Sequence, residues 1–259
     1  MLNVRPIPAF DDNYIWLLQS HAGPRVYVVD PGDESPVLDL LQREGLELEG
    51  ILITHKHGDH TGGVGDLLQA WPDAQVYGPA NESIANITAN VTGGDRISLP
   101  GLGVGFSVMD VPGHTEGHVA YYGEGVLFCG DTMFAAGCGR VFSGTHEQLH
   151  NSLQSIASLP PDTKVFCAHE YTIANLGFAK WVEPESAALL DRYREASDLR
   201  SRDKPTVPSL LQLELDTNPF LRSAEPTVIA AAERYAGKKL TTGAEVFTAI
   251  RNWKDREYD

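Results

Sequence analysis

Short apolar runs bounded by turn residues divide the first part of the chain into strands with a helix between them. The runs 15–18 and 26–29 predict two strands, each followed by residues typical of turns. Apolar residues then recur at i, i+3 and i+4, which predicts a helix over 36–44 with Ser35 as its N-cap. The β-branched run 50–54 predicts the next strand. The order of these elements is that of a β-α-β unit.

Strand patterns continue to about residue 168, and only helical patterns follow. The segment 81–90 fits neither pattern and is left without an assignment. The later predicted strands are 74–77, 104–111, 125–130 and 164–168, and the later predicted helices are 62–70, 185–202, 226–235 and 244–256. This order predicts an α+β chain whose last part is helical.

Composition and charge exclude some classes of partner. The chain has 259 residues, 42% of them hydrophobic, which suffices for one large domain or for a main domain with a smaller one. The formal charge of -15 argues against nucleic acid as a partner, because nucleic-acid binding draws on clustered Lys and Arg. A small anionic ligand in a local basic site stays compatible with that charge.

The N-terminal residues and the cysteines bear on the cellular compartment. The first eight residues have neither the basic and apolar regions of a signal peptide nor a long apolar span, so we expect no membrane association and a cytoplasmic location. The three cysteines, Cys129, Cys138 and Cys167, are an odd number without a C-x-x-C pair. They are expected to be free thiols packed in the core or in loops, neither a disulfide framework nor nucleophiles.

The densest candidate chemistry follows directly after the predicted strand 50–54. His55, His57, Asp59 and His60 place three imidazoles and one carboxylate within six positions. This mixture suits a divalent ion such as zinc, iron or manganese. His55 and His57 alternate whereas Asp59 and His60 are adjacent, so one turn could present them in two directions. Two metal ions are therefore more natural than one, and the alternative is a solvated His-rich loop.

Three further predicted strands lead to residues that could bind metal. His114, Asp131 and His169 follow the runs 104–111, 125–130 and 164–168. Each residue alone is as readily explained by an ordinary hydrogen bond or turn cap. If all four strands point the same way, however, five histidines and two aspartates meet at one edge of the sheets. That coincidence predicts a shared metal site.

The chain resembles the metallo-β-lactamase fold hydrolases through these ligand-type residues, and more narrowly the glyoxalase II (hydroxyacylglutathione hydrolase) family. The motifs that carry the narrower similarity are Phe128-Cys129-Gly130-Asp131-Thr132, Gly137-Cys138-Gly139-Arg140, Ala168-His169-Glu170-Tyr171-Thr172, Asn218-Pro219-Phe220-Leu221-Arg222, and Arg251 with Lys254. They are distributed along essentially the whole chain. The resemblance implies an αββα sandwich, residues 1–169, as the metal-binding catalytic domain, followed by a smaller helical substrate-binding domain, residues 170–259.

The resemblance also implies a ligand set and a reaction. The expected cofactors are two divalent ions, with zinc preferred and iron or manganese as alternatives. One ion would be held by His55, His57 and His114, the other by Asp59, His60 and His169, with Asp131 bridging them. Hydroxide shared by the ions would attack the thioester of S-D-lactoylglutathione or another S-2-hydroxyacylglutathione, releasing glutathione and the 2-hydroxy acid, D-lactate. This is the second step of methylglyoxal detoxification.

Substrate-binding residues follow from the same resemblance. Arg251 and Lys254, three apart at the margin of the apolar arc of the last helix, would bind the carboxylates of glutathione, although without the family a solvated basic pair would be the default interpretation. Arg140 and Tyr171 match other glutathione-binding positions, whereas Phe142 departs from members with Tyr there. His118 is expected to orient a ligand residue rather than bind metal. The small-molecule thioester is the expected partner of a monomer.

Other functions on the same fold are the alternatives. A persulfide dioxygenase would use one iron and lack the long helical tail, and a flavodiiron oxidoreductase would carry Glu in place of His57. An RNase of this fold would need a basic surface. A non-catalytic metal-binding scaffold would close its coordination shell, and the sequence does not show whether a position stays open.

Overall fold

The computed structural model describes residues 2–20 and 23–258. It contains two compact units, which are described in turn. The first unit comprises the described residues up to Asp110 together with Thr115–Gly130, and the second comprises Val111–His114 and the described residues from Asp131 onward.

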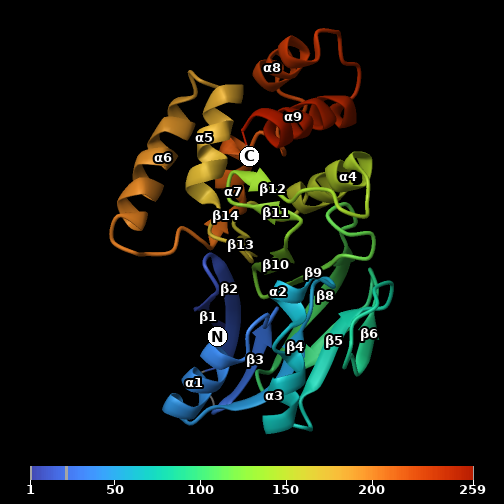
Figure 1. Cartoon of the computed structure of the whole chain (residues 1–259), viewed down its shortest axis with the longest axis vertical. Helices are drawn as coiled ribbons and strands as arrows, with labels where there is room; N and C mark the ends of the chain where they lie inside the picture. The colour runs from blue at the N-terminus through green and yellow to red at the C-terminus, as the bar shows by residue number, and fades with distance from the viewer. Residues whose placement is uncertain (1, 21–22, 259) are drawn as a thin grey trace. The chain divides into compact units, whose positions relative to one another are not determined.

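The first unit begins with a six-stranded sheet in chain order. Its first three strands are antiparallel, and the following strands are added in parallel. The strands are β1 (Leu2–Ala9), β2 (Asn13–Ser20), β3 (Arg25–Val29), β4 (Glu47–Leu52), β5 (Gln75–Pro79) and β6 (Ala89–Val91), and the helices among them are α1 (Ser35–Glu44), α2 (Gly58–Thr61) and α3 (Val64–Ala70) (Figure 1). Parallel neighbours need a crossover, which α1 supplies between β3 and β4.

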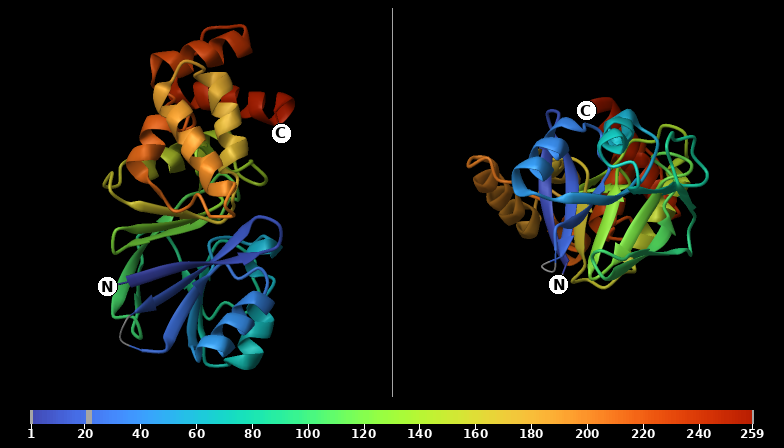
Figure 2. Two further views of the ribbon diagram at one scale, coloured as in Figure 1. Left: turned by 90° about the vertical axis from the view of Figure 1, so that its left-hand side faces the viewer. Right: turned by 90° about the horizontal axis from the view of Figure 1, so that it is seen from below.

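Four antiparallel strands form the second sheet of this unit. They are β7 (Arg96–Leu99), β8 (Val104–Asp110), β9 (Val119–Gly123) and β10 (Val126–Gly130). Because β8 and β10 are both antiparallel to β9, they run in the same direction. Helices α1 and α3 cover the face of the first sheet that is turned away from these strands (Figure 2). Their apolar side chains, such as Val37, Leu41 and Leu67, join Leu17 and Ile51 of the sheet in one core cluster.

Helices dominate the second unit. They are α4 (His146–Ala157), α5 (Thr172–Val182), α6 (Ala187–Arg200), α7 (Leu211–Thr217), α8 (Pro226–Ala236) and α9 (Gly243–Glu257). Two short strand pairs accompany them: the hairpin β11 (Met133–Phe134) with β12 (Gly137–Cys138), and β13 (Lys164–Cys167) with β14 (Ser209–Leu210). Leu176 and Ala179 of α5 and Leu189 and Ala196 of α6 belong to one buried cluster. These small and branched residues let the two helices pack closely.

The α+β class with two sheets and a helical C-terminal region is confirmed. Most predicted elements are present within a few residues of their expected bounds. Helix α1, however, begins at Ser35 itself, so Glu34 and not Ser35 is its N-cap. The sequence patterns missed β1, which contains Pro6 and Pro8, because proline in a run argues against a strand except at an edge. β1 is that edge, since it pairs with β2 alone.

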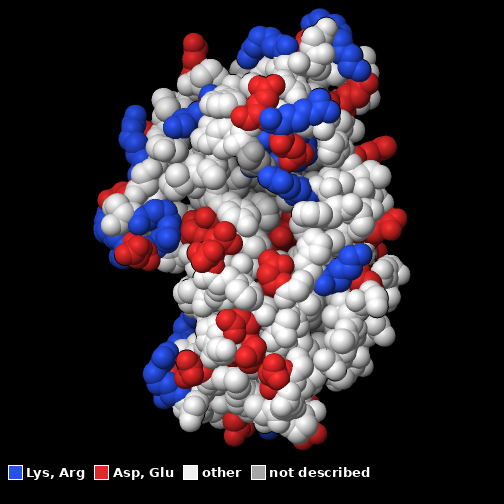
Figure 3. Space-filling model, viewed as in Figure 1, with Lys and Arg blue, Asp and Glu red and all other residues white. Residues whose placement is uncertain are grey.

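Two surface properties bear on partners. Among the residues that the structure describes, no helix has both the length and the apolar character needed to cross a membrane. Acidic and basic side chains are interspersed on the face in Figure 3.

Candidate metal centre

A single turn presents the first set of ligand-type residues. His55 and His57 follow β4, and Asp59 and His60 lie in the short helix α2, which begins at Gly58. His57 is the extended N-cap residue of α2, so the chain changes direction between the two pairs. Alternating residues before this point and consecutive helical residues after it point in different directions, as the sequence spacing predicts.

Asp30 orients two of these histidines. Its carboxylate accepts hydrogen bonds from the Thr54 backbone N–H at 2.8 Å and from the Thr54 hydroxyl at 2.7 Å, and its Oδ2 lies 3.0 Å from Nδ1 of His60. A carboxylate at this distance makes Nδ1 the donor and leaves Nε2 of His60 with its lone pair. Because the Thr54 hydroxyl donates to Asp30, it accepts from Nδ1 of His55 at 3.1 Å. Both imidazoles therefore offer Nε2 as a ligand atom.

Asp59 is held by a separate contact. Its Oδ2 accepts a hydrogen bond from the Asn13 amide at 3.1 Å and lies 3.4 Å from Nε2 of His60. The Asp30-Pro31-Gly32 turn also packs against it, because a Cβ at Gly32 would lie 1.9 Å from the Asp59 carbonyl oxygen. Asn13, Asp30 and Gly32 are thus positioning residues that the sequence interpretation missed. Only the turn signal of residues 30–32 marked that segment.

The second set of ligand-type residues follows the strands β8, β10 and β13. His114 donates from Nδ1 to the Arg140 carbonyl at 2.8 Å, so its Nε2 is the ligand atom, 3.5 Å from the Asp131 carboxylate. The other oxygen of Asp131 lies 3.4 Å from Nε2 of His169. The Tyr171 ring stacks on His169 with centroids 4.8 Å apart and fixes the plane of that imidazole. One carboxylate thus faces two imidazoles, as a bridging ligand would.

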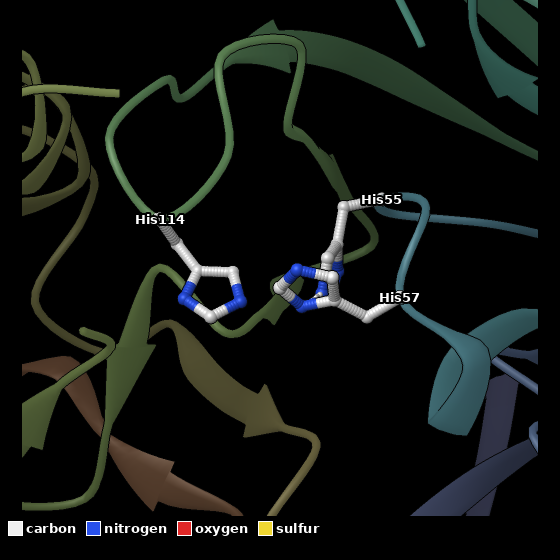
Figure 4. A group of neighbouring side chains, drawn as sticks. All are labelled: His55, His57 and His114. Carbon is white, nitrogen blue, oxygen red and sulfur yellow. Dashed lines mark hydrogen bonds between the residues drawn. The ribbon is translucent and has the colours of Figure 1, made fainter. Parts of the chain in front are cut away.

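The ligand atoms gather in three groups. Within each group the atoms lie within 4.8 Å of one another: His55, His57 and His114; His55, His60 and Asp131; and Asp59, His60 and His169. Figure 4 shows the first group, in which the three imidazole rings lie next to one another. His118 belongs to none of the groups found among the described residues, and its ring stacks on His55 at 4.5 Å. It fits the orienting role expected of it.

This donor set fits divalent metal ions. Nitrogen and carboxylate oxygen are the ligands that zinc and other borderline ions prefer. Nδ1 of His57 lies 3.0 Å from Nε2 of His55, so two ring nitrogens converge on one point. Hydrogen bonds at Nδ1 of His55, His60 and His114 leave Nε2 of each ring turned towards the other ligand atoms of its group. Both the chemistry and the orientation of the donors are thus those of a metal site.

Comparisons with known proteins agree along the whole chain. The Metallo-beta-lactamase superfamily model matches residues 9–169, and the Hydroxyacylglutathione hydrolase C-terminus model matches residues 170–257. A hydroxyacylglutathione hydrolase of Methylobacillus flagellatus is 52% identical over 98% of this chain and 99% of its own. One of Pseudomonas fluorescens is 51% identical over 99% and 100%. The chain belongs to the hydroxyacylglutathione hydrolase family.

Solved structures resemble the chain in fold. ETHE1 from Myxococcus xanthus covers 100% of this chain and 93% of its own at a TM-score of 0.67 and 21% identity, which supports the fold alone. TTHA1623, in a di-iron-bound form, covers 83% of this chain and 99% of its own at a TM-score of 0.58 and 27% identity. Membership of the hydroxyacylglutathione hydrolase family makes the chain a metal-dependent hydrolase with the metallo-β-lactamase fold.

Arg251 and Lys254, in the part matched by the hydroxyacylglutathione hydrolase C-terminus model, are not a solvated pair. Their exposed fractions are only 1% and 6%. Arg251 donates to the Cys138 carbonyl at 3.1 Å and to the Asp255 carboxylate at 2.8 Å. The same Asp255 oxygen lies 3.9 Å from Nε of Arg140, whose side chain is exposed. The burial excludes the solvated basic pair, which is the default interpretation when the family resemblance is set aside.

Phe142 and the three cysteines are the remaining residues for which the sequence made a prediction. Phe142 is exposed, and its ring meets His114 edge-on at 5.2 Å. Cys129, Cys138 and Cys167 are free and buried, as expected. Burial raises the pKa of Cys138 to about 11 and that of Cys167 to about 12. Thiols with such pKa values are almost fully protonated at neutral pH and do not act as nucleophiles.

Proposed function

We propose that the chain hydrolyses the thioester of S-2-hydroxyacylglutathiones, S-D-lactoylglutathione first among them, to glutathione and the 2-hydroxy acid. The observation that carries the proposal is the set of seven ligand-type residues whose atoms fall into three close groups. Full-length similarity to hydroxyacylglutathione hydrolases supports the choice of substrate. The reaction would be the second step of methylglyoxal detoxification.

Each ligand residue has a role in this proposal. His55, His57 and His114 would hold one ion, Asp59, His60 and His169 would hold the second, and Asp131 would be a ligand shared by both. Zinc is the proposed ion, with iron or manganese as alternatives, and the di-iron form of TTHA1623 supports a two-ion site. When bound, two such ions lower the pKa of water towards about 7 and polarise the substrate carbonyl. Asp59 and Asp131 together leave the centre with a net positive charge.

Other polar residues orient the proposed metal ligands and determine which ring nitrogen of a histidine can bind metal. The Asp30 carboxylate accepts a hydrogen bond from Nδ1 of His60, and the backbone carbonyl of Arg140 accepts one from Nδ1 of His114. These two imidazoles can therefore bind a metal only through Nε2. Asn13 directs the Asp59 carboxylate. The leaving group needs little help, because a thiol of pKa about 8.5 departs far more readily than an amine. Lack of an added general acid is therefore no obstacle to thioester cleavage.

The glutathione end of the substrate is assigned to four residues. Arg251 and Lys254 would bind its carboxylates, and Arg140 and Tyr171 would contact the rest of the tripeptide. The exposed guanidinium of Arg140 supports such contacts. Phe142 supplies an apolar ring where a tyrosine would add a hydroxyl, so we propose one fewer hydrogen bond at this position.

We also propose the division of labour that the sequence predicts. Residues 1–169 would supply the metal chemistry and residues 170–259 the recognition of the substrate. The limits of the two matching family models, 9–169 and 170–257, support this division. A cytoplasmic monomer stays part of the proposal.

The experiment is steady-state hydrolysis of S-D-lactoylglutathione by protein reconstituted with zinc, iron or manganese, together with elemental analysis. We expect turnover and about two ions per chain. Protein stripped with a chelator and then reloaded is the matched control, and it should lose and regain activity. Oxygen uptake with glutathione persulfide, or only one bound ion, would favour the persulfide dioxygenase alternative. Metal binding without turnover of either substrate would favour a scaffold.

A further inference from the structure

The β11–β12 hairpin, which follows Asp131, has an unusual backbone at its tip. Ala136 has a φ of 56°, in the left-handed region that residues with a side chain seldom adopt. Gly137 has no room for a side chain, because a Cβ there would lie 2.4 Å from the Asn175 side chain. A strained conformation of this kind persists only when its surroundings hold it. The hairpin therefore needs external contacts to keep its shape.

Helices α5 and α7 supply those contacts through buried polar side chains. The Glu214 carboxylate accepts from the Ala136 backbone N–H at 2.8 Å. The Asn218 amide donates to the Gly137 carbonyl at 2.9 Å and to Glu214 at 3.2 Å, and the Asn175 amide donates to the Ala135 carbonyl at 3.1 Å. Glu214 and Asn218 are fully buried. The strained residue Ala136 and its two neighbours are thus each bound by a side chain from α5, from α7 or from the C-cap of α7.

Arg192 of α6 neutralises the buried carboxylate. Its guanidinium donates to Glu214 and to the Thr217 hydroxyl, and its exposed fraction is 5%. A buried carboxylate without a partner would be costly, so the contact with Arg192 compensates the burial of Glu214 beside the hairpin. We call Arg192, Glu214 and Asn218 the hairpin anchor.

The hairpin in turn contacts Arg251. The last residue of β12 is Cys138, and its carbonyl accepts the hydrogen bond from Nη1 of Arg251 at 3.1 Å. The other terminal nitrogen of Arg251 donates to Asp255, one turn along α9. The Cys138 carbonyl and the Asp255 carboxylate bind opposite terminal nitrogens of the planar guanidinium, and two acceptors placed in this way define its plane. The carbonyl of Cys138 is therefore part of what orients Arg251.

We propose that the hairpin anchor is a positioning device for substrate binding: it fixes the β11–β12 hairpin, and the Cys138 carbonyl then sets the Arg251 guanidinium for the anionic end of the substrate. The effect on substrate binding rests on the proposed function, whereas the fixing of the hairpin does not. A purely structural role would also explain a buried ion pair. Loss of a positioning device should loosen the hairpin alone, whereas loss of a purely structural contact should destabilise the protein as a whole.

The test compares Glu214→Gln with Thr217→Val in the full-length, metal-loaded protein. A glutamine has one carbonyl oxygen, so it cannot serve both Arg192 and Ala136 as the carboxylate does. Thr217→Val removes a buried contact of the same Arg192 but touches no hairpin residue, which makes it the matched control. If Glu214→Gln does not fold, Asn218→Ala removes the bond to Gly137 and leaves the ion pair intact.

The first readout needs no substrate. A thiol reagent is applied to the native proteins, and peptide mass analysis follows the labelling of Cys138 relative to Cys129, which is fully buried in β10. Local opening of the hairpin should label Cys138 about tenfold faster in Glu214→Gln, with Cys129 unchanged. Thr217→Val should alter the ratio little. Equal acceleration of both cysteines would indicate general destabilisation and overturn the proposal.

The second readout separates binding from chemistry. With a glutathione thioester, Glu214→Gln should raise KM about fivefold and change kcat less than about twofold, since the metal ligands stay in place. Thr217→Val should resemble the wild type. If Cys138 is labelled selectively but KM is unchanged, the link between the hairpin and Arg251 is refuted. If the wild type has no thioesterase activity, the proposed function is refuted, and the labelling result alone tests the hairpin anchor.

Discussion

The turn at residues 55–60 and helix α9 position functional side chains in different ways. The turn carries four ligand-type residues within six positions, and it follows strand β4, which fixes its direction. On α9, by contrast, Arg251 is fixed by a carbonyl 113 residues away in the chain. Four of the seven proposed metal ligands are thus encoded within one short segment, whereas the orientation of Arg251 depends on a long-range contact. Damage to the two regions should differ in kind and in size.

The sharpest test of the metal side is Asp131→Ala. Its carboxylate oxygens lie 3.5 Å from Nε2 of His114 and 3.4 Å from Nε2 of His169. Removing a shared ligand should disturb both ions, so we expect kcat to fall by roughly three orders of magnitude or more. Steady-state hydrolysis and metal content measured on the same sample check this. Turnover near that of the wild type would mean that Asp131 is not a ligand.

A smaller loss is expected from Asp30→Asn, which leaves every ligand in place. An amide has only one acceptor oxygen, so either the Thr54 N–H that bonds to Oδ1, or the Thr54 hydroxyl and His60 Nδ1 that bond to Oδ2, lose their acceptor. Loss of an orienting partner commonly costs about 10- to 100-fold in metal affinity or activity. A competition titration with a chromophoric chelator measures that affinity. Asp33→Asn in the same turn is the control, since Asp33 bonds to the Ser35 N–H instead.

The substrate side should respond in KM. Replacing Arg251 or Lys254 by Ala should raise KM for a glutathione thioester about tenfold, with less change in kcat, because charged hydrogen bonds contribute roughly 1.5–3 kcal/mol. High salt should reduce the difference between variant and wild type. Arg256→Ala, which removes an exposed cation from the same helix, is the control and should leave KM unchanged. A double variant of Arg251 and Lys254 with unaltered KM would contradict the assignment.

The smallest expected effect is a pH dependence of stability where α4 meets α9. Burial lowers the pKa of His150 below its ordinary 6.5, and its ring packs against Phe247 with Nε2 3.0 Å from the Ser223 hydroxyl. The unfolded chain therefore takes up a proton before the folded chain does, so stability falls as the pH drops below about 6.5. His150→Gln should make Tm fall less steeply between about pH 7 and pH 5. An unchanged slope would mean that His150 does not titrate in this range.

Much of the fold and of the candidate metal centre could be predicted, for a common physical reason. A buried strand needs a continuous apolar run, and a metal needs imidazoles and carboxylates, so both leave strong local signals. All seven predicted ligand-type residues belong to the three groups of close ligand atoms. Their roles as ligands stay a prediction until metal is measured.

The remaining features depended on partners far along the chain. Nothing local distinguishes Asp30 from an ordinary turn aspartate, because its function lies in reaching Thr54 and His60. Without the family resemblance, Arg251 would be placed at the surface, because charged helical residues usually are exposed. Its burial depends on Asp255 and on the distant Cys138 carbonyl, which both accept hydrogen bonds from its guanidinium. Glu214 likewise reads as one acidic residue in a short helix. Only the fold reveals that its carboxylate meets a strained peptide.

The two prolines of β1 have a consequence for how the protein behaves when concentrated. A sheet edge displays unpaired N–H and C=O groups on which a strand of another molecule can assemble. Pro6 and Pro8 remove two N–H groups from this edge, and being two residues apart they interrupt the same side of the strand. The opposite edge, β6, has only three residues. The first sheet is thereby poorly suited to strand-by-strand aggregation, so replacing both prolines by valine should promote fibrous assembly on mild heating.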